Sequence, residues 1–237
     1  MPTARDALAA VADVEGWLTP DQATRLWERA AAVAPPACIV EIGSYRGRSA
    51  IVLAMAAPDG AEVIAIDPHA GNDRGPQQIE GTASEGERDN AAFRANLERA
   101  GVAGRIRHVR LPSQEALAEL PGQVDLLYVD GAHRYTPARE DLERWGARVR
   151  PGGRMLVHDS FSSIGVTLAI LRLLVFAREF RYEGRTGSLA EYTRVPVAGS
   201  ARLRNALRQA GQLGWFARNV ALKLLIVLRL RRGDWPY

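Results

Sequence analysis

The sequence predicts a doubly wound α/β fold, in which helices cover both faces of a mostly parallel sheet. From residue 38 to residue 159, short apolar runs alternate with amphipathic segments, which is typical of consecutive strand-helix units. The apolar runs are continuous rather than interrupted at every second residue, as expected of strands that are buried on both faces. Polar and charged residues follow directly after the runs, at the sheet edge where this fold class binds its ligands.

Residues 1–35 are predicted to form a helical segment ahead of the sheet. Its two helices are expected over residues 3–17 and 20–34. Thr19 is a suitable N-cap for the second helix, and Pro20 is favourable in its first position. Pro35 ends this helix because a proline ring blocks the preceding helical turn.

Residues 36–198 are predicted to form the α/β domain itself. Its parallel strands are expected at residues 38–42, 62–67, 105–111, 124–130 and 153–159. Its helices are expected at residues 48–57, 88–100, 113–119, 137–148 and 162–178. Phe180–Glu183 and Leu189–Val195 are then predicted to pair as a hairpin around Gly184 and Gly187.

A polar, glycine-rich stretch interrupts this alternation at residues 71–90. Long connections without secondary structure are uncommon in compact domains and are usually functional loops or disordered segments. Because the stretch follows the strand that ends at Asp67, we expect it to form a lid over the active site. A passive surface insertion is the alternative.

Residues 199–237 are predicted to form a basic helical extension. From residue 200 onward the chain has eight basic residues and one acid, which leaves residues 1–199 with a net charge of about −3. This slightly acidic body argues against nucleic acid as the substrate. The apolar stretch Trp215–Leu230 is too short and too charged to span a bilayer. We expect it to dock on the body or on a second subunit of a homo-oligomer, with peripheral attachment to an anionic membrane as the alternative.

The use of cysteine and the start of the chain bear on the cell compartment. Cys38 is the single cysteine, so an intrachain disulfide is excluded, which suits a reducing cytosol. The first residues lack a basic stretch followed by an apolar core, so no secretory signal peptide is expected. The sequence therefore predicts a cytoplasmic protein.

A strand-turn-helix signature at Ile39–Ala54 is the most informative feature of the chain. It contains the pattern Glu41-x-Gly43-x-x-x-Gly47, whose glycines let the backbone turn sharply and approach a ligand closely. The helix that follows directs free N–H groups into this turn. The next strand ends on Asp67, where a carboxylate can accept hydrogen bonds from ribose hydroxyls. These features indicate a site for an adenosine cofactor.

The spacing of the glycines distinguishes between cofactor types. A dinucleotide-binding turn has the pattern Gly-x-Gly-x-x-Gly and a P-loop ends in Gly-Lys-Ser/Thr, and neither pattern is present here. Glu41 would repel a phosphate but would hold an ammonium group. S-adenosylmethionine carries an α-amino group and no phosphate. A glycine-rich turn that binds no ligand is the alternative.

With this motif the chain resembles the class I S-adenosylmethionine-dependent methyltransferases. The resemblance implies a Rossmann-like methyltransferase fold with a seven-stranded sheet, which the two hairpin strands complete. It also implies cofactor-binding residues in the turn and at the ends of the following strands. These are Glu41, Gly43, Ser44, Tyr45, Gly47, Ser49, Asp67, His69, Ser113, Gln114 and Asp130. Serine is also a common N-cap without any ligand, so Ser113 is a weak signal.

A second group of polar residues follows two later strands. One buried run ends in Asp130, and a glycine turn presents His133 three residues later. The next run ends in His158-Asp159, so two carboxylates lie at the tips of neighbouring strands. Converging carboxylates repel one another unless a cation or a proton lies between them, and an oxygen-rich site suits Mg²⁺. Histidines that only satisfy polar groups at strand ends are the alternative.

The sequences Asp-Gly-x-His and His-Asp-Ser resemble those of metal-dependent O-methyltransferases that act on macrolide sugars and related products, and of the cephalosporin-biosynthesis methyltransferase-like group. The resemblance covers residues 36–160, roughly half of the chain. It implies that Asp130, His158 and Asp159 bind the metal. It also implies that His133, beside Asp130, is the catalytic base that deprotonates the acceptor hydroxyl. The position of His158 is often Glu in those relatives, so either Mn²⁺ replaces Mg²⁺ or His158 lies outside the ligand set.

These motifs predict an O-methyltransferase that uses S-adenosylmethionine and a divalent metal. Its expected acceptor is a small molecule or oligosaccharide, with a hydroxyl of a sugar or glycoside as the methylated group. A catechol-type enzyme with an aromatic acceptor and a non-catalytic cofactor-binding protein are the alternatives. A nucleic-acid methyltransferase is disfavoured because the basic excess lies in the C-terminal extension rather than in a cleft.

Overall fold

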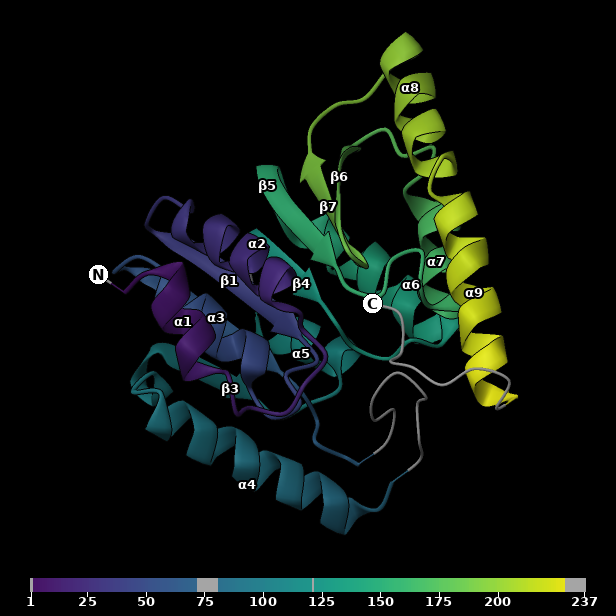
Figure 1. Ribbon diagram of the computed structural model, residues 1–237. Helices are drawn as coiled ribbons and strands as arrows, with labels where there is room; N and C mark the ends of the chain where they lie inside the picture. The colour runs from purple at the N-terminus through teal and green to yellow at the C-terminus, as the bar shows by residue number, and fades with distance from the viewer. Residues whose placement is uncertain (1, 72–80, 121, 229–237) are drawn as a thin grey trace.

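The structure is a computed structural model that describes residues 2–71, 81–120 and 122–228. Its centre is a seven-stranded sheet with the order β3-β2-β1-β4-β5-β7-β6 (Figure 1). The strands are β1 (Ala37–Ile42), β2 (Ala61–Ile66), β3 (Ile106–Val109), β4 (Val124–Val129), β5 (Val149–Val157), β6 (Phe180–Thr186) and β7 (Leu189–Arg194). The first five strands pair in parallel, whereas β7 is antiparallel to both β5 and β6. The predicted doubly wound sheet and its C-terminal hairpin are confirmed.

Helices cover both faces of this sheet. They are α1 (Ala4–Ala10), α2 (Pro20–Ala31), α3 (Arg48–Ala56), α4 (Ala83–Arg99), α5 (Ser113–Glu119), α6 (Tyr135–Arg144), α7 (Ile164–Leu173), α8 (Gly199–Ala210) and α9 (Leu213–Val227). Helices α1 to α4 pack on the face that presents Ile39 and Leu126, and α5 to α7 pack on the face that presents Val40 and Leu127. Because successive strand residues point to opposite faces, both faces can be covered only if consecutive residues are apolar.

The direction of winding reverses between β1 and β4. From β1 the chain passes through α3 to β2 on one side, whereas β4 lies on the other side of β1 and leads through α6 to β5. Ile42 at the end of β1 pairs with Ile66 of β2 and with Val129 of β4, so the three strands end at one level. The residues that follow them therefore meet at the switch point where this fold class binds ligands.

Both N-terminal helices end earlier than predicted, α2 at Ala31 rather than at residue 34. Helix α2 begins at Pro20 as predicted, and Thr19 forms a capping box with Gln22. Helix α1 ends at Ala10 rather than at residue 17, because Val11 and Val14 turn into the core and are almost fully buried. The segment between the two helices is then free to reach the edge of the sheet that carries the site.

The predicted lid at residues 71–90 is wrong in its second half. Helix α4 begins at Ala83, where Thr82 and Glu85 form a capping box, so residues 83–90 are helical. Their polar composition reflects the exposed positions of the first helical turns together with Asp89 and Asn90, which are buried against the body. Residues 72–80 lie outside the part of the chain that the structure describes, so a lid formed by them stays a prediction.

Three further boundaries shift by several residues. Helix α6 ends at Arg144 and a 3₁₀ turn follows at Gly146–Arg148, so strand β5 already begins at Val149. Helix α7 ends at Leu173 rather than at residue 178. These shifts leave the tips of the strands, where the polar motifs lie, unchanged.

The C-terminal extension is helical through Val227 and packs on the body, as expected. Trp215 and Phe216 of α9 contact the apolar core, and Asn219 is fully buried. The guanidinium of Arg185 on β6 lies over the ring of Trp215, 3.8 Å from its centroid. In Figure 1, α8 and α9 follow one another along one side of the molecule. Among the described residues, no helix combines the length and the apolar composition needed to cross a membrane.

Candidate active site

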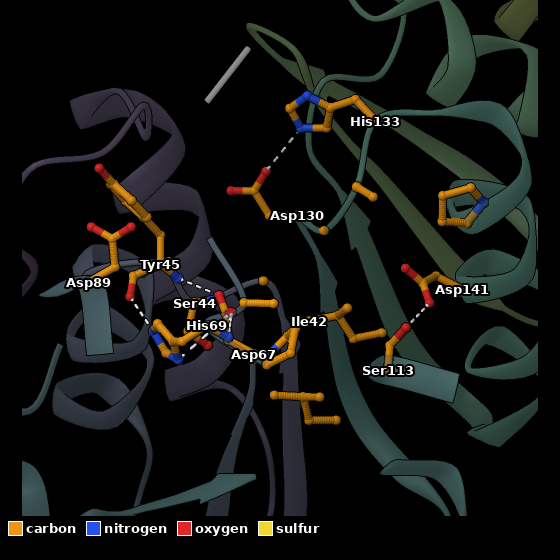
Figure 2. Close-up of a pocket in the computed structure, with 18 of the residues that line it drawn as sticks. Ile42, Ser44, Tyr45, Asp67, His69, Asp89, Ser113, Asp130, His133 and Asp141 are labelled. Carbon is orange, nitrogen blue, oxygen red and sulfur yellow. Dashed lines mark hydrogen bonds and ion pairs between the residues drawn. The ribbon is translucent and has the colours of Figure 1, made fainter. Parts of the chain in front are cut away.

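A cavity of about 380 Å³ lies at the switch point between β1 and β4, beyond the ends of β1, β2 and β4. Its walls come from the turn after β1, the residues after β2, the start of α5, the turn after β4 and the segment between α1 and α2. The volume is in the range of sites that bury a drug-sized ligand. Figure 2 shows the turn and Asp67 on one side of the cavity, Ser113 and Asp141 on the other, and His133 with Asp130 at a third corner.

The glycine turn is braced against two neighbouring strands. Gly43 has a φ of +85°, and a Cβ atom on it would lie 2.2 Å from the carbonyl oxygen of Asp130. On the other side, a carboxylate oxygen of Asp67 accepts hydrogen bonds from the backbone N–H groups of Ser44 (2.9 Å) and Tyr45 (2.8 Å). Glycine at position 43 is therefore required by packing on β4, and Asp67 positions the turn in addition to facing the cavity.

His69 completes this side of the cavity. Its backbone N–H donates to Asp67 (2.8 Å), and its ring Nε2 lies 2.7 Å from the carbonyl oxygen of Tyr45. Because a carbonyl can only accept, Nε2 carries the proton. The ring is thereby held in one orientation in the cavity wall, as the sequence predicted for a residue that lines the pocket.

Glu41 and Gly47 lie behind the turn rather than in the cavity wall. Glu41 is fully buried, and this burial raises the pKa of its carboxyl to about 8 although the hydroxyls of Ser49 and Ser44 oppose the shift. Gly47 has a φ of +89° and forms the N-cap of α3, where it packs against Phe93. The predicted contact between Glu41 and an ammonium group stays a prediction. The buried position of the Glu41 side chain, behind the cavity wall, does not support it.

At the opposite end of the cavity, Ser113 and Gln114 share a buried acid. The Ser113 hydroxyl and the Gln114 amide both donate to one oxygen of Asp141 on α6, at 2.5 and 2.8 Å. Burial raises the pKa of Asp141 to about 6, although both hydrogen bonds oppose this shift. These three residues form a polar corner that can exchange hydrogen bonds with a heterocyclic base.

Four titratable side chains meet where β4 and β5 end. His133 Nε2 lies 3.1 Å from a carboxylate oxygen of Asp159 and 3.8 Å from one of Asp130. His158 Nδ1 lies 3.2 Å from Asp130 and 3.6 Å from Asp159. The sequence predicted this grouping, and the pairing of Val129 with Val157 produces it by ending both strands together.

The four groups shift one another's pKa values. Burial alone would lower the pKa of His158, but the carboxylate of Asp130 raises it to about 10. For Asp130 and Asp159 both effects have the opposite sign. Burial would raise the pKa of each carboxyl, and the two imidazoles bring that pKa below its usual range. The carboxylates and the imidazoles thus favour one another's charged forms.

Two residues that the sequence analysis did not single out fix this cluster in place. The hydroxyl of Tyr128 on β4 donates to Asp130 (2.9 Å). On the far side, Gln22 of α2 donates through its amide to Ser188 (3.0 Å), so its amide oxygen is the atom that faces Nε2 of His158 at 3.3 Å. An amide oxygen accepts, so Nε2 of His158 donates and Nδ1 faces the carboxylates.

The donor set at the cluster fits a divalent cation. One ligand atom each from Asp130, His133 and Asp159 lies within 4.8 Å of the others. One oxygen of Asp159 is buried without a hydrogen-bond partner among the described residues. A buried carboxylate oxygen without a donor is costly unless a cation is bound. This geometric group of Asp130, His133 and Asp159 shares both carboxylates with the predicted ligand set. It contains His133, whereas the resemblance implied His158.

Most of the predicted site residues line the cavity. These are Gly43, Ser44, Tyr45, Ser49, Asp67, His69, Ser113, Gln114, Asp130 and His133. His158 and Asp159 lie behind this wall, each about 2% exposed.

The segment between α1 and α2 forms a wall that no motif indicated. The hydroxyl of Tyr45 donates to Glu15 (2.9 Å), and the ring of Trp17 lies 5.3 Å from that of Tyr45. Asp89 of α4 also reaches the cavity and pairs with Arg46 at 2.9 Å. These residues join the site only through tertiary contacts, so the local sequence carries no signal for them.

Comparisons with known proteins agree on the nature of the fold. The family model described as a methyltransferase domain matches residues 40–160, a little over half of the chain. Among solved structures, Rv0187 from MTB with bound cofactor is 22% identical, with a TM-score of 0.56 over 81% of this chain and 88% of that chain. The O-methyltransferase TomG from Streptomyces achromogenes, in complex with SAM, is 19% identical, with a TM-score of 0.57 over 83% and 89%. An O-methyltransferase from Bacillus cereus in complex with SAH is also 19% identical, with a TM-score of 0.58 over 82% and 92%.

Proposed function

Because the chain belongs to the methyltransferase domain family, we propose that it transfers the methyl group of S-adenosylmethionine to a hydroxyl oxygen of a sugar, glycoside or related small molecule, with the help of a divalent metal. The observation that carries this proposal is the position of one residue. Asp130 lies at the end of β4, where it both lines the cofactor-sized cavity and belongs to the carboxylate-imidazole cluster. A methyl donor in the cavity would therefore have its reactive end beside the cluster.

The two ends of the cavity support an orientation for the cofactor. Ser113, Gln114 and Asp141 suit the adenine base, and Asp67 suits the ribose hydroxyls as in other doubly wound folds. The methionine portion would then lie along the glycine turn toward Asp130. The structures of TomG with SAM and of the Bacillus enzyme with SAH are consistent with this class of cofactor.

The two histidines differ in a way that separates their roles. The side chain of His133 is 13% exposed and lines the cavity, whereas that of His158 is 1% exposed and faces the carboxylates from behind. We therefore assign His133 as the base that accepts the proton of the acceptor hydroxyl at Nε2. Asp130 and Asp159 would then hold the metal, and Nδ1 of His158, 3.2 Å from Asp130, would replace His133 of the geometric group as the nitrogen ligand.

Methyl transfer from a sulfonium is an in-line displacement, so much of the rate depends on positioning. A bound divalent metal would lower the pKa of the acceptor hydroxyl and orient its oxygen. His133 would contribute about 10²–10⁴-fold as a general base. Carboxylate oxygens favour Mg²⁺, and the imidazole of His158 makes Mn²⁺ the alternative.

Calorimetry and turnover together test this function. We expect S-adenosylhomocysteine to bind the purified protein, and we expect turnover of a hydroxylated acceptor to require added Mg²⁺ or Mn²⁺. His133→Asn should abolish turnover and leave cofactor binding intact. His108→Asn is the matched control, because His108 lies on β3 outside both the cavity wall and the cluster. Full activity of the His133 variant, or no cofactor binding by folded protein, would overturn the proposal.

A specific observation favours a second acceptor class. Trp17 and Tyr45 place two aromatic rings in the cavity wall, which suits an aromatic diol as well as the hydrophobic face of a sugar. A catechol-type acceptor should therefore be assayed beside glycosides. Turnover of catechols alone would replace the sugar assignment and keep the metal-assisted mechanism.

A further inference from the structure

Large exposed apolar side chains concentrate on the two C-terminal helices. Among the described residues of α8 and α9 and the position after them, these are Leu203, Leu207, Leu213, Leu224, Leu225, Val227 and Leu228. Four of the leucines are more than half exposed: Leu203 (59%), Leu207 (61%), Leu224 (56%) and Leu228 (55%). Large apolar side chains left exposed in this number on two consecutive helices point to an interaction site.

The exposed leucines lie on the outward faces of helices that are firmly attached to the body. Leu203 and Leu207 are four residues apart on α8, and Leu224 and Leu228 are four apart at the end of α9, so each pair shares a face. The inward faces carry buried polar side chains instead. Asn205 accepts a hydrogen bond from the backbone of β6 at Tyr182 (2.7 Å). The outward apolar faces are therefore a property of docked helices rather than of a detached tail.

The charged residues of α8 and α9 have one sign. Between residues 199 and 228 the sequence contains five basic residues and no acid, and the remaining residues to 237 add three arginines and one aspartate. Arg204 and Arg218 are exposed on α8 and α9. A second copy of the chain would fit poorly, because a two-fold contact would bring the same basic surface against itself. The partner that this surface favours is anionic and offers apolar contacts.

We propose that the outward face of α8 and α9 docks the protein on an anionic lipid membrane, with the helices lying in the plane of its surface. Leucines that enter the boundary between headgroups and acyl chains, together with arginines that meet anionic headgroups, are the two contributions that hold interfacial helices. A nucleic acid would satisfy the arginines but would leave the leucines in water.

Vesicle binding by the full-length protein tests this proposal. We expect it to cosediment with vesicles of phosphatidylcholine and phosphatidylglycerol, and to bind vesicles of phosphatidylcholine alone much more weakly. Added salt should reduce the binding because it screens the charges. Binding that is equal on both vesicle types, or absent from both, would overturn the proposal.

Two pairs of variants separate the apolar and the charged contributions. Leu224→Gln with Leu228→Gln should lower the partition coefficient at least about tenfold, because two exposed leucines no longer enter the membrane. Arg204→Gln with Arg218→Gln should lower it about 25-fold, at roughly fivefold for each arginine. Arg94→Gln with Arg99→Gln is the matched control, since both arginines are exposed on α4, away from α8 and α9.

Thermal unfolding of each variant shows whether it is folded, and sedimentation velocity shows its mass. Loss of vesicle binding by a folded leucine variant supports the proposal. A dimer that dissociates in that variant, without vesicle binding by the parent protein, would show that a second copy occupies the surface instead. Unchanged vesicle binding by both the leucine and the arginine variants would also contradict the membrane proposal.

Discussion

Gly43 is a residue at which the structure leaves little room for change. Its φ is +85°, and a Cβ atom would lie 2.2 Å from the carbonyl oxygen of Asp130. We expect Gly43→Ala to lower the free energy of unfolding by more than the ~1–2 kcal/mol that a left-handed alanine costs, because the tip of β4 must also move. Denaturant unfolding measures this loss. Gly101→Ala is the matched control, with a φ of +68° and nothing within 4 Å, and equal losses in both variants would count against the packing argument.

Glu41 is expected to make stability depend on pH. Burial raises its pKa from 4.5 to about 8, so the folded chain keeps a proton that the unfolded chain releases. This contribution to stability is fully present below about pH 4.5 and is lost as the pH rises through about 8. We expect Glu41→Gln to flatten the unfolding free energy over this range. Asp141→Asn, whose acid has a pKa of about 6, should flatten only the lower part, and an unchanged profile in Glu41→Gln would contradict the assignment.

At the residue scale, the sequence predicted the site residues that directly follow the ends of strands. Asp67, Asp130 and Asp159 follow parallel strands, and parallel strands end at one edge, so their proximity is a consequence of the fold class. Asp141 and Gln22 were missed because each lies within an amphipathic helix, where a polar residue is usually solvated. Only the packing of that helix on the sheet turns their side chains toward the site.

Helix α2 supports the cluster through a single side chain. Gln22 is fully buried and joins Thr19, Ser188 and His158 by hydrogen bonds. We expect Gln22→Leu to lower the free energy of unfolding by about 1–3 kcal/mol, because it leaves buried polar groups without partners. NMR of the imidazole nitrogens should also show a changed chemical shift of Nε2 of His158, because its hydrogen bond to Gln22 is lost.

The control for this prediction lies on the same helix. Thr24→Val removes an exposed hydroxyl that donates to the carbonyl of Pro20, one turn earlier on the same helix, so it should change neither stability nor the His158 signal appreciably. A Gln22 variant that matches Thr24→Val in both measurements would show that α2 does not position His158.

At the scale of elements, the existence of each strand was predictable but several helix ends were not. Continuous apolar runs define the strands, since both faces must be covered. Helix α1 ends early because Val11 and Val14 pack into the core, a tertiary effect without a local signal. The start of α4 did carry a signal, the capping box of Thr82 and Glu85, but it lies in a glycine-rich stretch that favours a loop.

For the whole molecule, cofactor binding should raise stability. A ligand present at about 100 times its Kd stabilises the folded state by ~2.7 kcal/mol, which corresponds to an increase in Tm of about 5–10 °C for a chain of this size. S-adenosylhomocysteine should produce this increase in thermal unfolding. NAD is the matched control, because the turn lacks the dinucleotide glycine spacing. An equal shift with NAD would show that the cavity does not discriminate between these cofactors.

The architecture of the whole molecule followed from the order of its elements, whereas the placement of its two ends did not. Alternating strands and helices determine a doubly wound sheet and the edge at which the site lies. The walls added by the N-terminal segment and the docking of α9 depend on contacts between residues far apart in the chain, such as Trp17 with Tyr45 and Arg185 with Trp215.

Helix α9 also touches the loop that follows the cluster. Asn219 and Lys223 donate hydrogen bonds to the carbonyl oxygens of Phe161 (3.4 Å) and Ser162 (3.0 Å), two and three residues after Asp159. Two binding sites that are coupled through one structural element affect each other equally. A ligand at the cluster that shifts this loop therefore changes the affinity of α9 for its partner by some factor. Binding of that partner to α9 changes the affinity of the cluster for the ligand by the same factor. Occupancy of the active site would then set the residence time of the protein on a surface, and the surface would act as an effector of the enzyme.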